Sequence, residues 1–413
     1  MDAQRTTCVV AGGGPAGMVL GLLLARARVE VTVLEKHADF LRDFRGDTVH
    51  PSTLRLLDEL GLAEKFEKLP YSKVERAELP GPDGVPVTTA DFTRLSGKYR
   101  YLAMVPQWDL LDLLAEAGAA EPTFTLRMDT AATGTLTERG RVVGVSYRTA
   151  AGDTGELRAE LTIAADGRWS LLRTAVGLRA TEYPVPMDTW WTRLPRHADD
   201  APTGLRVNTH GTDMGLTLNR DDYYQVAYFA RKGFDPTLRA EGMARFRERL
   251  TALFPVLADR MDAVQTMDQV KFLDVRLNRL RRWHTDGLLC IGDAAHAMSP
   301  IGGVGINLAV QDAVATATLL AGPLLRGRVR PAELAKVRRR RWLPTVLVQT
   351  AQRAMHRFII APVVTGRRTT TTEVPARLLQ RLPVMHGLLA YLVGIGPRPE
   401  HAPEFARRAP VRG

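Results

Sequence analysis

The sequence predicts an α/β protein, in which a parallel-sheet domain assembled from discontinuous segments carries an inserted, mostly antiparallel β-sheet and a helical C-terminus. Three observations support this prediction. Residues 8–34 have the pattern of a strand, a glycine-rich turn, a helix and a second strand. Residues 183–280 contain short aromatic and β-branched segments separated by turn residues, which is typical of antiparallel strands. From Pro331 onward the pattern is helical and basic.

The N-terminal unit has the glycine spacing of a dinucleotide-binding site. Gly12 allows a tight turn, Gly14 lets the backbone approach a pyrophosphate, and Gly17 lets helix and strand pack closely. The helix N-terminus offers free N–H groups and a partial positive charge to phosphates. A glycine turn that only packs a helix would not require the acid that ends the second strand. The residues expected to bind the nucleotide here are Gly12, Gly14, Pro15, Ala16, Gly17, Glu35 and Lys36.

Glu35 also indicates which nucleotide is bound. It lies 18 residues after Gly17, where its carboxylate can accept hydrogen bonds from a ribose diol. An acid at this position disfavours a 2′-phosphate on that ribose. The expected nucleotide is therefore FAD or NAD rather than NADP.

Length and cysteine usage limit the class of protein. A chain of 413 residues can form two or more lobes. Cys8 and Cys290 lie in apolar predicted strands and are expected to be reduced packing residues. No signal peptide precedes the first strand, and no uncharged apolar stretch is long enough to span a bilayer. We expect a cytoplasmic protein without a transmembrane segment or a metal, and the oligomeric state is not predicted.

The chain is strongly basic, with a net charge of +11 and its densest cluster at residues 338–341. Nucleic-acid binding is not expected, because no nucleic-acid-binding fold is recognised and the excess arginine is scattered over the chain. The cluster is expected to lie on a solvated helix face. Attraction of an anionic nicotinamide nucleotide is a second interpretation.

The order of the segments favours one kind of nucleotide protein. The expected division is a nucleotide domain from residues 1–75, 100–180 and 281–345, a substrate-binding sheet domain from 76–99 and 181–280, and a C-terminal helical region from 346–413. A dehydrogenase usually completes its Rossmann domain in one stretch. The discontinuity therefore favours a flavoprotein.

Two later motifs allow the family to be named. The first is Asp166-Gly-Arg-Trp-Ser-Leu-Leu-Arg173, and the second is Gly292-Asp-Ala-Ala-His296, which continues to Pro300-Ile-Gly-Gly-Val-Gly-Ile-Asn307. With these motifs in this order, the chain resembles the FAD-dependent aromatic hydroxylases over about residues 6–345. These are the single-component flavoprotein monooxygenases of the p-hydroxybenzoate hydroxylase type.

The resemblance implies a Rossmann-like FAD-binding domain and one non-covalent FAD. It implies that NADH or NADPH reduces the flavin and that O2 then forms a flavin hydroperoxide. This would hydroxylate or epoxidise an aromatic or polyketide-like small molecule. It further implies that Arg45 and Gln107 contact the cofactor, and that Asp166 lies near the flavin phosphates.

The third motif suits a flat, ionisable ring. Asp293 ends a strand, where it can accept a hydrogen bond from a ribityl hydroxyl, and Pro300 would line the site beside the ring. Glycine-rich backbone can lie close to a ring because it has no Cβ. The N–H groups of Gly305, Ile306 and Asn307 would face the pyrimidine edge, which becomes negative when the flavin is reduced.

Several side chains remain open to two interpretations. His296 could be a general base, but packing within the loop is favoured. Asp166 and Arg173 could pair across the turn, either near the cofactor or as a purely structural salt bridge. Four aromatic residues of the inserted sheet could line the substrate site, although core packing is favoured for each: Trp190, Tyr223, Tyr224 and Tyr228.

Three alternatives remain. The first is a non-oxygenating reductase or dehydrogenase of the same fold, of the geranylgeranyl reductase type. The second is a flavin halogenase, disfavoured because Thr192 occupies the position of the second tryptophan in that family's motif. The third is a binding protein without catalysis. The absence of a second glycine fingerprint argues against a separate NADPH domain.

Overall fold

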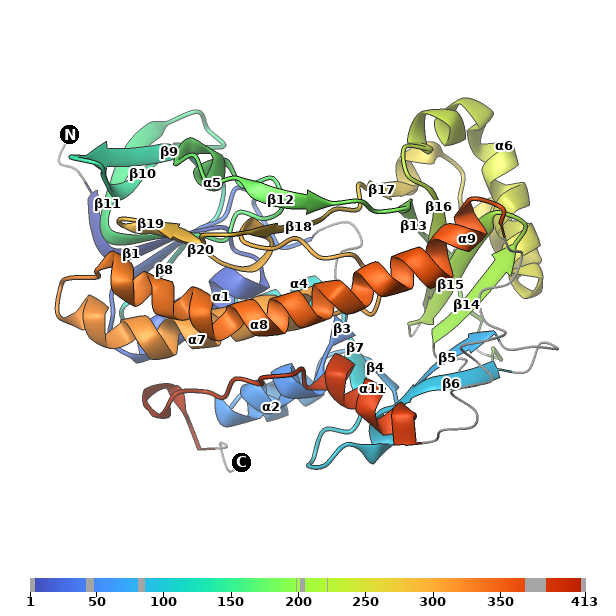
Figure 1. Cartoon of the computed structure of the whole chain (residues 1–413), viewed down its shortest axis with the longest axis horizontal. Coiled ribbons are helices and arrows are strands. Elements are labelled where there is room, and N and C mark those ends of the chain that lie inside the picture. Colours follow the sequence, from blue (N-terminus) through green and yellow to red (C-terminus); the bar gives the residue numbers. More distant parts are fainter. Residues whose placement is uncertain are drawn as a thin grey trace.

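The computed structural model describes residues 4–41, 48–80, 86–197, 199–200, 205–220, 222–367 and 384–409. Figure 1 shows two lobes, with a long helix, α8 (Pro331–Met355), running along both. The first lobe contains the N-terminal strand and the parallel sheet. The second contains the inserted antiparallel sheet. This arrangement confirms the predicted fold class, whereas the expected residue boundaries of the domains stay a prediction.

The first lobe is built on a sheet with the order β19-β20-β11-β1-β2-β8, and β11 also pairs with the β9–β10 hairpin. The strands from β20 to β8 are parallel. The four residues Cys8–Ala11 of β1 are buried, as the continuous apolar run predicts. The strands are β1 Gln4–Ala11, β2 Val31–Leu34, β8 Phe124–Arg127, β9 Thr130–Glu138, β10 Arg141–Thr149, β11 Thr154–Ala164, β19 His284–Thr285 and β20 Leu288–Cys290.

Helices pack against this sheet and against one another. Helix α1 contacts both α7 and α4, and α7 contacts α8. The remaining helices are α1 Pro15–Arg26, α2 Pro51–Glu59, α3 Ala63–Glu67, α4 Gln107–Ala119, α5 Leu171–Ala175, α6 Asp235–Leu253, α7 Gly305–Leu325, α9 Ala361–Val364 and α11 Val384–Gly394. Helix α6 is interrupted at Gly242, where φ is +78°. The shorter helical turns are η2 Phe92–Arg94, η3 Pro255–Ala263, η4 Met267–Gln269, η5 Gly292–Ala294, η6 His356–Ile360, a π-helical turn, and η7 Glu404–Ala406.

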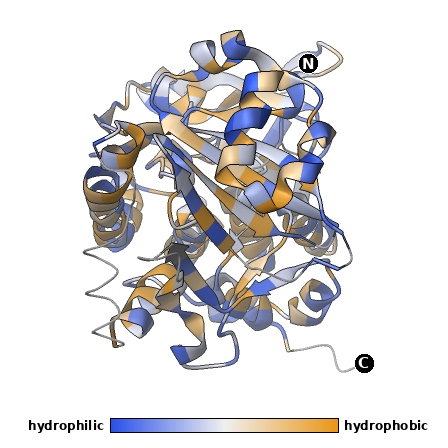
Figure 2. Cartoon of the chain, turned by 90° about the vertical axis from the view of Figure 1, so that its right-hand side faces the viewer, coloured by the Kyte–Doolittle hydropathy of each residue, from blue (hydrophilic) through white to orange (hydrophobic). Residues whose placement is uncertain are grey.

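The second lobe is an antiparallel sheet with the order β14-β15-β16-β13-β17. Figure 2 looks onto this end of the molecule, where hydrophilic and hydrophobic residues alternate along the ribbon. One face packs under α6, and β12 pairs with β18 between the lobes. The strands are β12 Ala180–Tyr183, β13 Met187–Pro195, β14 Leu205–His210, β15 Asp213–Asn219, β16 Tyr223–Arg231, β17 Lys271–Leu273 and β18 Leu277–Leu280.

Two small sheets and the C-terminal segment lie along one side of the lobes, and β5 contacts β14 of the inserted sheet (Figure 1). One small sheet has the order β3-β7-β4 and the other pairs β5 with β6. Helix α11 packs on β6 and η2, and the segment after it follows α2 (Figure 1). There Glu59 accepts a hydrogen bond from the Ala402 N–H at 2.7 Å. The strands are β3 Thr48–Val49, β4 Ser72–Val74, β5 Arg76–Pro80, β6 Pro86–Asp91 and β7 Leu102–Met104.

Helix α7 is long and apolar enough to cross a membrane by length and composition. Its most apolar window is 78% buried inside the protein, against the sheet and the neighbouring helices. Its apolar sequence is therefore explained by its position in the core.

A buried ion network connects α7 to α8 and to the C-terminal segment. Asp312 on α7 accepts a hydrogen bond from the Arg341 Nε at 3.1 Å, and its other oxygen lies 2.5 Å from His296 Nε2. Arg341 and Arg340 both contact Glu400. Burial alone would raise the pKa of Asp312, but the opposite charges of His296 and Arg341 hold it below its usual value.

Removal of the Asp312 carboxylate is expected to destabilise the protein strongly. Asp312→Ala leaves the buried Arg341 and His296 without this partner, and loss of one member of a buried pair typically costs about 3–5 kcal/mol. The control is Arg245→Ala, which breaks an exposed pair with Glu248 and should cost less than about 1 kcal/mol. Urea unfolding measures both. Equal effects of the two substitutions would contradict the role given to Asp312.

Candidate functional site

The three motifs lie at one edge of the parallel sheet. The first follows β1, the second follows β11 and the third follows β20, and these strands are neighbours in the order β20-β11-β1-β2. Glu35 follows β2 at the same edge. A Cβ on Gly12 would lie 2.3 Å from the Ala165 carbonyl oxygen, and one on Gly292 would lie 3.3 Å from the Ala16 Cβ. The fold therefore assembles one site from segments far apart in sequence.

The first glycine loop contains one glycine that close packing requires and another that faces open space. A Cβ on Gly17 would lie 1.9 Å from the Gly12 carbonyl oxygen, so this glycine allows the turn and α1 to meet. A Cβ on Gly14 would meet no described atom within 4 Å. Gly14 is the N-cap of α1 and provides no side-chain cap, and the first turn contains Pro15 and no acid. The helix N-terminus thus offers uncapped N–H groups beside free space, as an anion site requires.

Glu35 is buried beside this loop. Its Oε2 accepts a hydrogen bond from the Gly13 N–H at 2.9 Å, and its Oε1 accepts one from the His37 N–H at 3.2 Å. These two contacts orient the Glu35 carboxylate at the loop. Lys36, the next residue, is exposed.

The second motif is joined to the third through Arg173. Its guanidinium donates to the Ala294 carbonyl at 3.0 Å and to the Arg168 carbonyl at 3.1 Å. Asp166 instead accepts a hydrogen bond from the Leu172 N–H at 3.1 Å, at the start of α5. The suggested Asp166–Arg173 pair is therefore wrong. Burial raises the pKa of Asp166, against the lowering effect of its hydrogen bonds from Ser170 and Leu172.

The third motif places a carboxylate and a helix N-terminus at the same edge. Asp293 is partly exposed and lies 3.5 Å from Arg168. A turn follows, in which the Gly303 N–H donates to the Pro300 carbonyl at 3.0 Å. Helix α7 then begins at Gly305 without a side-chain cap or an acid in its first turn. The N–H groups of its first turn are thus available to an electron-rich group.

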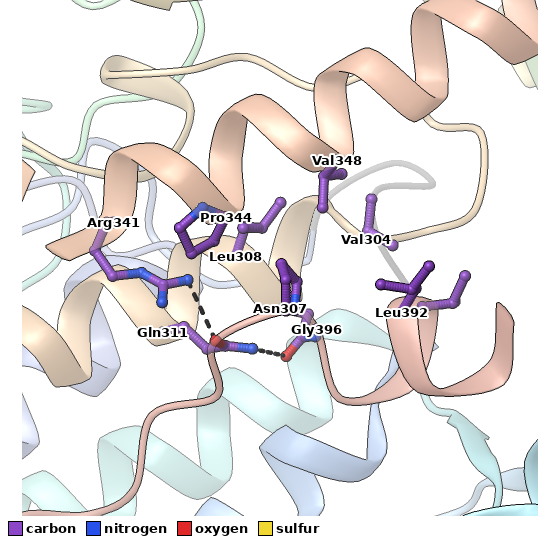
Figure 3. A pocket seen from close by; sticks show the side chains of 11 residues that line it. Val304, Asn307, Leu308, Gln311, Arg341, Pro344, Val348, Leu392 and Gly396 are labelled. Atoms are coloured by element: carbon purple, nitrogen blue, oxygen red, sulfur yellow. Dashed lines mark hydrogen bonds between the residues drawn. The ribbon is translucent and has the colours of Figure 1, made fainter. Parts of the chain in front are cut away.

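Asn307 contributes differently from its neighbours. Its side-chain oxygen accepts hydrogen bonds from Ser52 at 2.6 Å and from Gln311 at 3.2 Å. Figure 3 shows this Asn307–Gln311 contact continuing to Arg341. The cavity that these residues line between α7, α8 and α11 measures only about 10 Å³, the space of one water. It is too small for a ligand, so the Asn307 side chain holds α7 in place.

The other expected cofactor contacts are placed as follows. Gln107 is the first residue of α4 and is half-buried, and Ile306 lies in the first turn of α7 and is half-buried. Arg45 lies outside the described residues.

His296 is a packing residue, as the favoured interpretation expects. Its side chain is 1% exposed, binds Asp312, and lies with its ring centre 4.9 Å from that of Trp283. A histidine enclosed in this way has no access to a substrate.

A second histidine, which the sequence analysis missed, lies beside the Pro300 turn. Ser299 Oγ is 2.8 Å from His356 Nε2, and the Ser299 oxygen also accepts the Ile301 N–H at 3.3 Å. His356 begins a π-helical turn after α8, is 4% exposed, and its Nδ1 has no hydrogen-bond partner in the described part of the chain. Burial lowers its pKa to about 4, so it is neutral near pH 7. Nothing in the local sequence marks it, since the contact joins residues far apart.

The aromatic residues of the inserted sheet face two ways. Trp190, Tyr224 and Tyr228 pack in the cluster under α6, and the Trp190 indole donates to Asp235 at 2.8 Å. Tyr223 lies under the Arg193 guanidinium, 4.8 Å from it. Three of the four aromatic candidates are thus core residues, as favoured.

Trp191 lies on the opposite face of β13. It packs against two apolar clusters, one shared with the small sheets and α11 and one shared with the Pro300 turn and α9. Its Nε1 is buried without a partner among the described residues. The period-two alternation of strands would have separated Trp190 from Trp191. The sequence alone did not show which face of the inserted sheet is turned toward the first lobe.

These features fit FAD. Two helices have uncapped N-termini at one sheet edge, a Cβ on Gly14 would meet no described atom within 4 Å, and the carboxylates of Glu35 and Asp293 lie at the same edge. The free N–H groups at the start of α7 suit the edge of the ring that becomes negative on reduction.

Comparisons with known proteins agree. Residues 5–349 match the family model described as FAD binding domain. The chain is 33% identical over 392 residues to 6-methylpretetramide 4-monooxygenase of Streptomyces rimosus, covering 94% of this chain and 92% of the relative. Two solved structures share the fold: the OxyS anhydrotetracycline hydroxylase from Streptomyces rimosus (TM-score 0.74, 24% identity, 95% of this chain and 76% of that chain) and the flavin-dependent halogenase CmlS (TM-score 0.75, 22% identity, 96% and 74%).

The family match covers most of the chain, and the relative aligns along nearly its whole length. The chain belongs to the FAD binding domain family and is an FAD-dependent monooxygenase of the aromatic hydroxylase type.

Proposed function

We propose that the substrate is a phenolic, fused-ring polyketide, bound between the Pro300 turn and the inserted sheet. The observation that carries this proposal is the contact of Ile301 with the apolar cluster of the sheet face opposite α6. This contact brings the third motif to the sheet. The similarity to a monooxygenase named for 6-methylpretetramide supports the substrate class.

We propose the following roles for the chain around FAD. Glu35 binds the adenosine ribose, and Gly14 with the α1 N-terminus binds the pyrophosphate. Asp293 binds the ribityl chain, and the N–H groups at the start of α7 face the pyrimidine edge. When bound, FAD accepts electrons from NADH or NADPH and transfers one oxygen atom of O2 to the substrate.

The apolar sheet face would exclude water from the reacting groups, and the Trp191 N–H would donate to a substrate oxygen. Pro300 would fix the turn beside the ring. The two described cysteines are free and buried, which agrees with our proposal that the protein works in the cytoplasm.

The oxygenation proposal is tested with a panel of polycyclic phenols, NADPH and ¹⁸O2. An accepted phenol should stimulate NADPH oxidation and yield a product with one ¹⁸O atom. Trp191→Phe should raise the KM for that phenol by roughly 3- to 10-fold, the effect of one lost hydrogen bond. The control Trp342→Phe, on exposed α8, should leave KM unchanged. NADPH-dependent saturation of a double bond without oxygen incorporation would instead indicate a reductase.

The two glycines of the first loop should respond differently to alanine. Gly14→Ala should fold normally, because its φ of −74° suits any residue and its Cβ meets no described atom. Its methyl group would occupy the pyrophosphate space and weaken FAD on the order of tenfold. Gly17→Ala should destabilise the apoprotein by about 1–3 kcal/mol through its clash with Gly12. Apoprotein melting and FAD titration separate the two effects. Unchanged FAD affinity of Gly14→Ala would refute the pyrophosphate position.

Buried neutral histidines should make the protein sensitive to mild acid. Burial lowers the pKa of His356 to about 4, below the usual value of about 6.5 for an unfolded chain. Between these values the unfolded state binds more protons, so the free energy of unfolding falls as the pH drops from 6.5 to 4. His50 acts in the same direction, because burial also lowers its pKa to about 4.

His356→Gln should flatten this pH dependence, and His210→Gln, at an exposed position, should not. Urea unfolding between pH 7.5 and 4.5 tests both variants. Parallel profiles for His356→Gln and the unchanged protein would contradict a neutral buried His356.

A further inference from the structure

The basic run at residues 338–341 divides into two pairs. Arg340 and Arg341 turn inward and bind Glu400 and Asp312. Arg338 and Arg339 turn the other way, because successive residues of a helix point about 100° apart. No single solvated face contains the run, so the outward pair needs its own explanation.

Arg338 and Arg339 line a groove of about 490 Å³ with three basic residues from another element. Arg281 and Arg282 lie between β18 and β19, and His284 is the first residue of β19, against which α8 packs. The remaining lining residues are Ala332 and Ala335 of α8. The groove therefore contains four guanidinium groups and no carboxylate.

In the described part of the chain, none of these four arginines forms an ion pair or hydrogen bond. The acids on adjoining segments bind elsewhere: Asp286 pairs with Arg141 and Glu333 with Arg326. The Arg338 Nε and the His284 Nδ1 are buried atoms without a hydrogen-bond partner among the described residues. Like charges gathered without counter-charge repel one another, and buried donors without acceptors cost free energy. Arg338 lies over the Trp342 ring, 5.6 Å from its centre, and this contact explains the position of one guanidinium but not the gathering of all four.

We propose that this basic groove is a binding site for a phosphate-rich anion with the chemistry of a nucleotide diphosphate. The fork of a guanidinium matches phosphate oxygens in pairs, and four of them on two elements can neutralise a group carrying several negative charges. The groove volume lies in the range of small-molecule sites and exceeds the needs of a single inorganic anion. His284 provides a further donor. Burial lowers its pKa first, and Arg282 and Arg338 lower it further.

The site is distinct from the proposed FAD site. Trp283, between Arg282 and His284 in sequence, points inward and packs on His296 of the third motif. The groove residues flank this tryptophan on the outer side, where Arg281, Arg282 and Arg339 are exposed. A ligand bound there would therefore not displace the flavin.

The test uses the FAD-loaded full-length protein and inorganic pyrophosphate, with binding measured by calorimetry. The groove variants are R338A/R339A and R281A/R282A. The control R148A/R179A removes the same charge at exposed positions that have no described ion-pair partner. The groove variants should bind pyrophosphate roughly tenfold or more weakly, and the control should bind as the unchanged protein does. Equal binding by groove and control variants, or binding no tighter than that of sulfate, would overturn the proposal.

Melting temperature distinguishes a binding role from a structural one. Without anion, R338A/R339A should melt at the same temperature as the unchanged protein or higher, because it removes repulsion. A lower melting temperature with unchanged pyrophosphate affinity would show that the arginines serve the fold and would refute the site.

Two further measurements show whether the bound diphosphate belongs to the nicotinamide nucleotide or to a free nucleotide. If it belongs to the nicotinamide nucleotide, the groove variants should raise the KM for NADPH in flavin reduction by the same factor as they weaken pyrophosphate binding. If it belongs to a free nucleotide, ADP binding should weaken by that factor while flavin reduction is unchanged. Failure to oxygenate any phenol would bear on the proposed function alone, since the binding measurement requires no turnover.

Discussion

The position of the loop around Gly292 depends on the buried carboxylate of Asp312. It accepts hydrogen bonds from the Gly292 N–H at 3.1 Å and from Arg341 at 3.1 Å, and it contacts His296. A charge at this depth is tolerated only when its partners replace water. Because Asp312 needs these partners, its hydrogen bonds hold the turn before Asp293 against α7 and α8. Through Glu400 this network extends to the C-terminal segment, so residues distant in sequence help to hold the third motif in place.

Adjacent parallel strands do the rest of the positioning. Each strand delivers one short polar segment to the same edge, and the helices that follow β1 and the third motif present uncapped N-termini there. Arg173 donates hydrogen bonds to carbonyl groups of the second and third motifs, and so holds the backbones of these two segments together. The inserted sheet is a separate element, and it meets the third motif through the contact of Ile301 with its apolar face.

Local chemistry explains what could be predicted from sequence. Gly12, Gly17 and Glu35 belong to one βαβ unit, so their positions relative to one another could be predicted from their spacing in the sequence. The partners of Asp166 and Arg173 could not be predicted, because both bind backbone groups whose positions only the fold defines. The Ser299–His356 contact and the division of the arginine run depend on where α8 lies. The choice between Trp190 and Trp191 required knowing which lobe covers each face of the inserted sheet.

The interleaved order of the strands has a consequence for folding during synthesis. Cys8 of β1 pairs with Leu161 of β11, and Ile163 of β11 pairs with Leu289 of β20. The first strand therefore leaves the ribosome long before its neighbour on that side exists, and the sheet closes only after β20 has followed. Most of the inserted sheet, whose strands pair mainly with near neighbours in sequence, can form in the interval. Such long-range pairing is slow and leaves apolar strands exposed, so the nascent chain has a prolonged need for protection from aggregation.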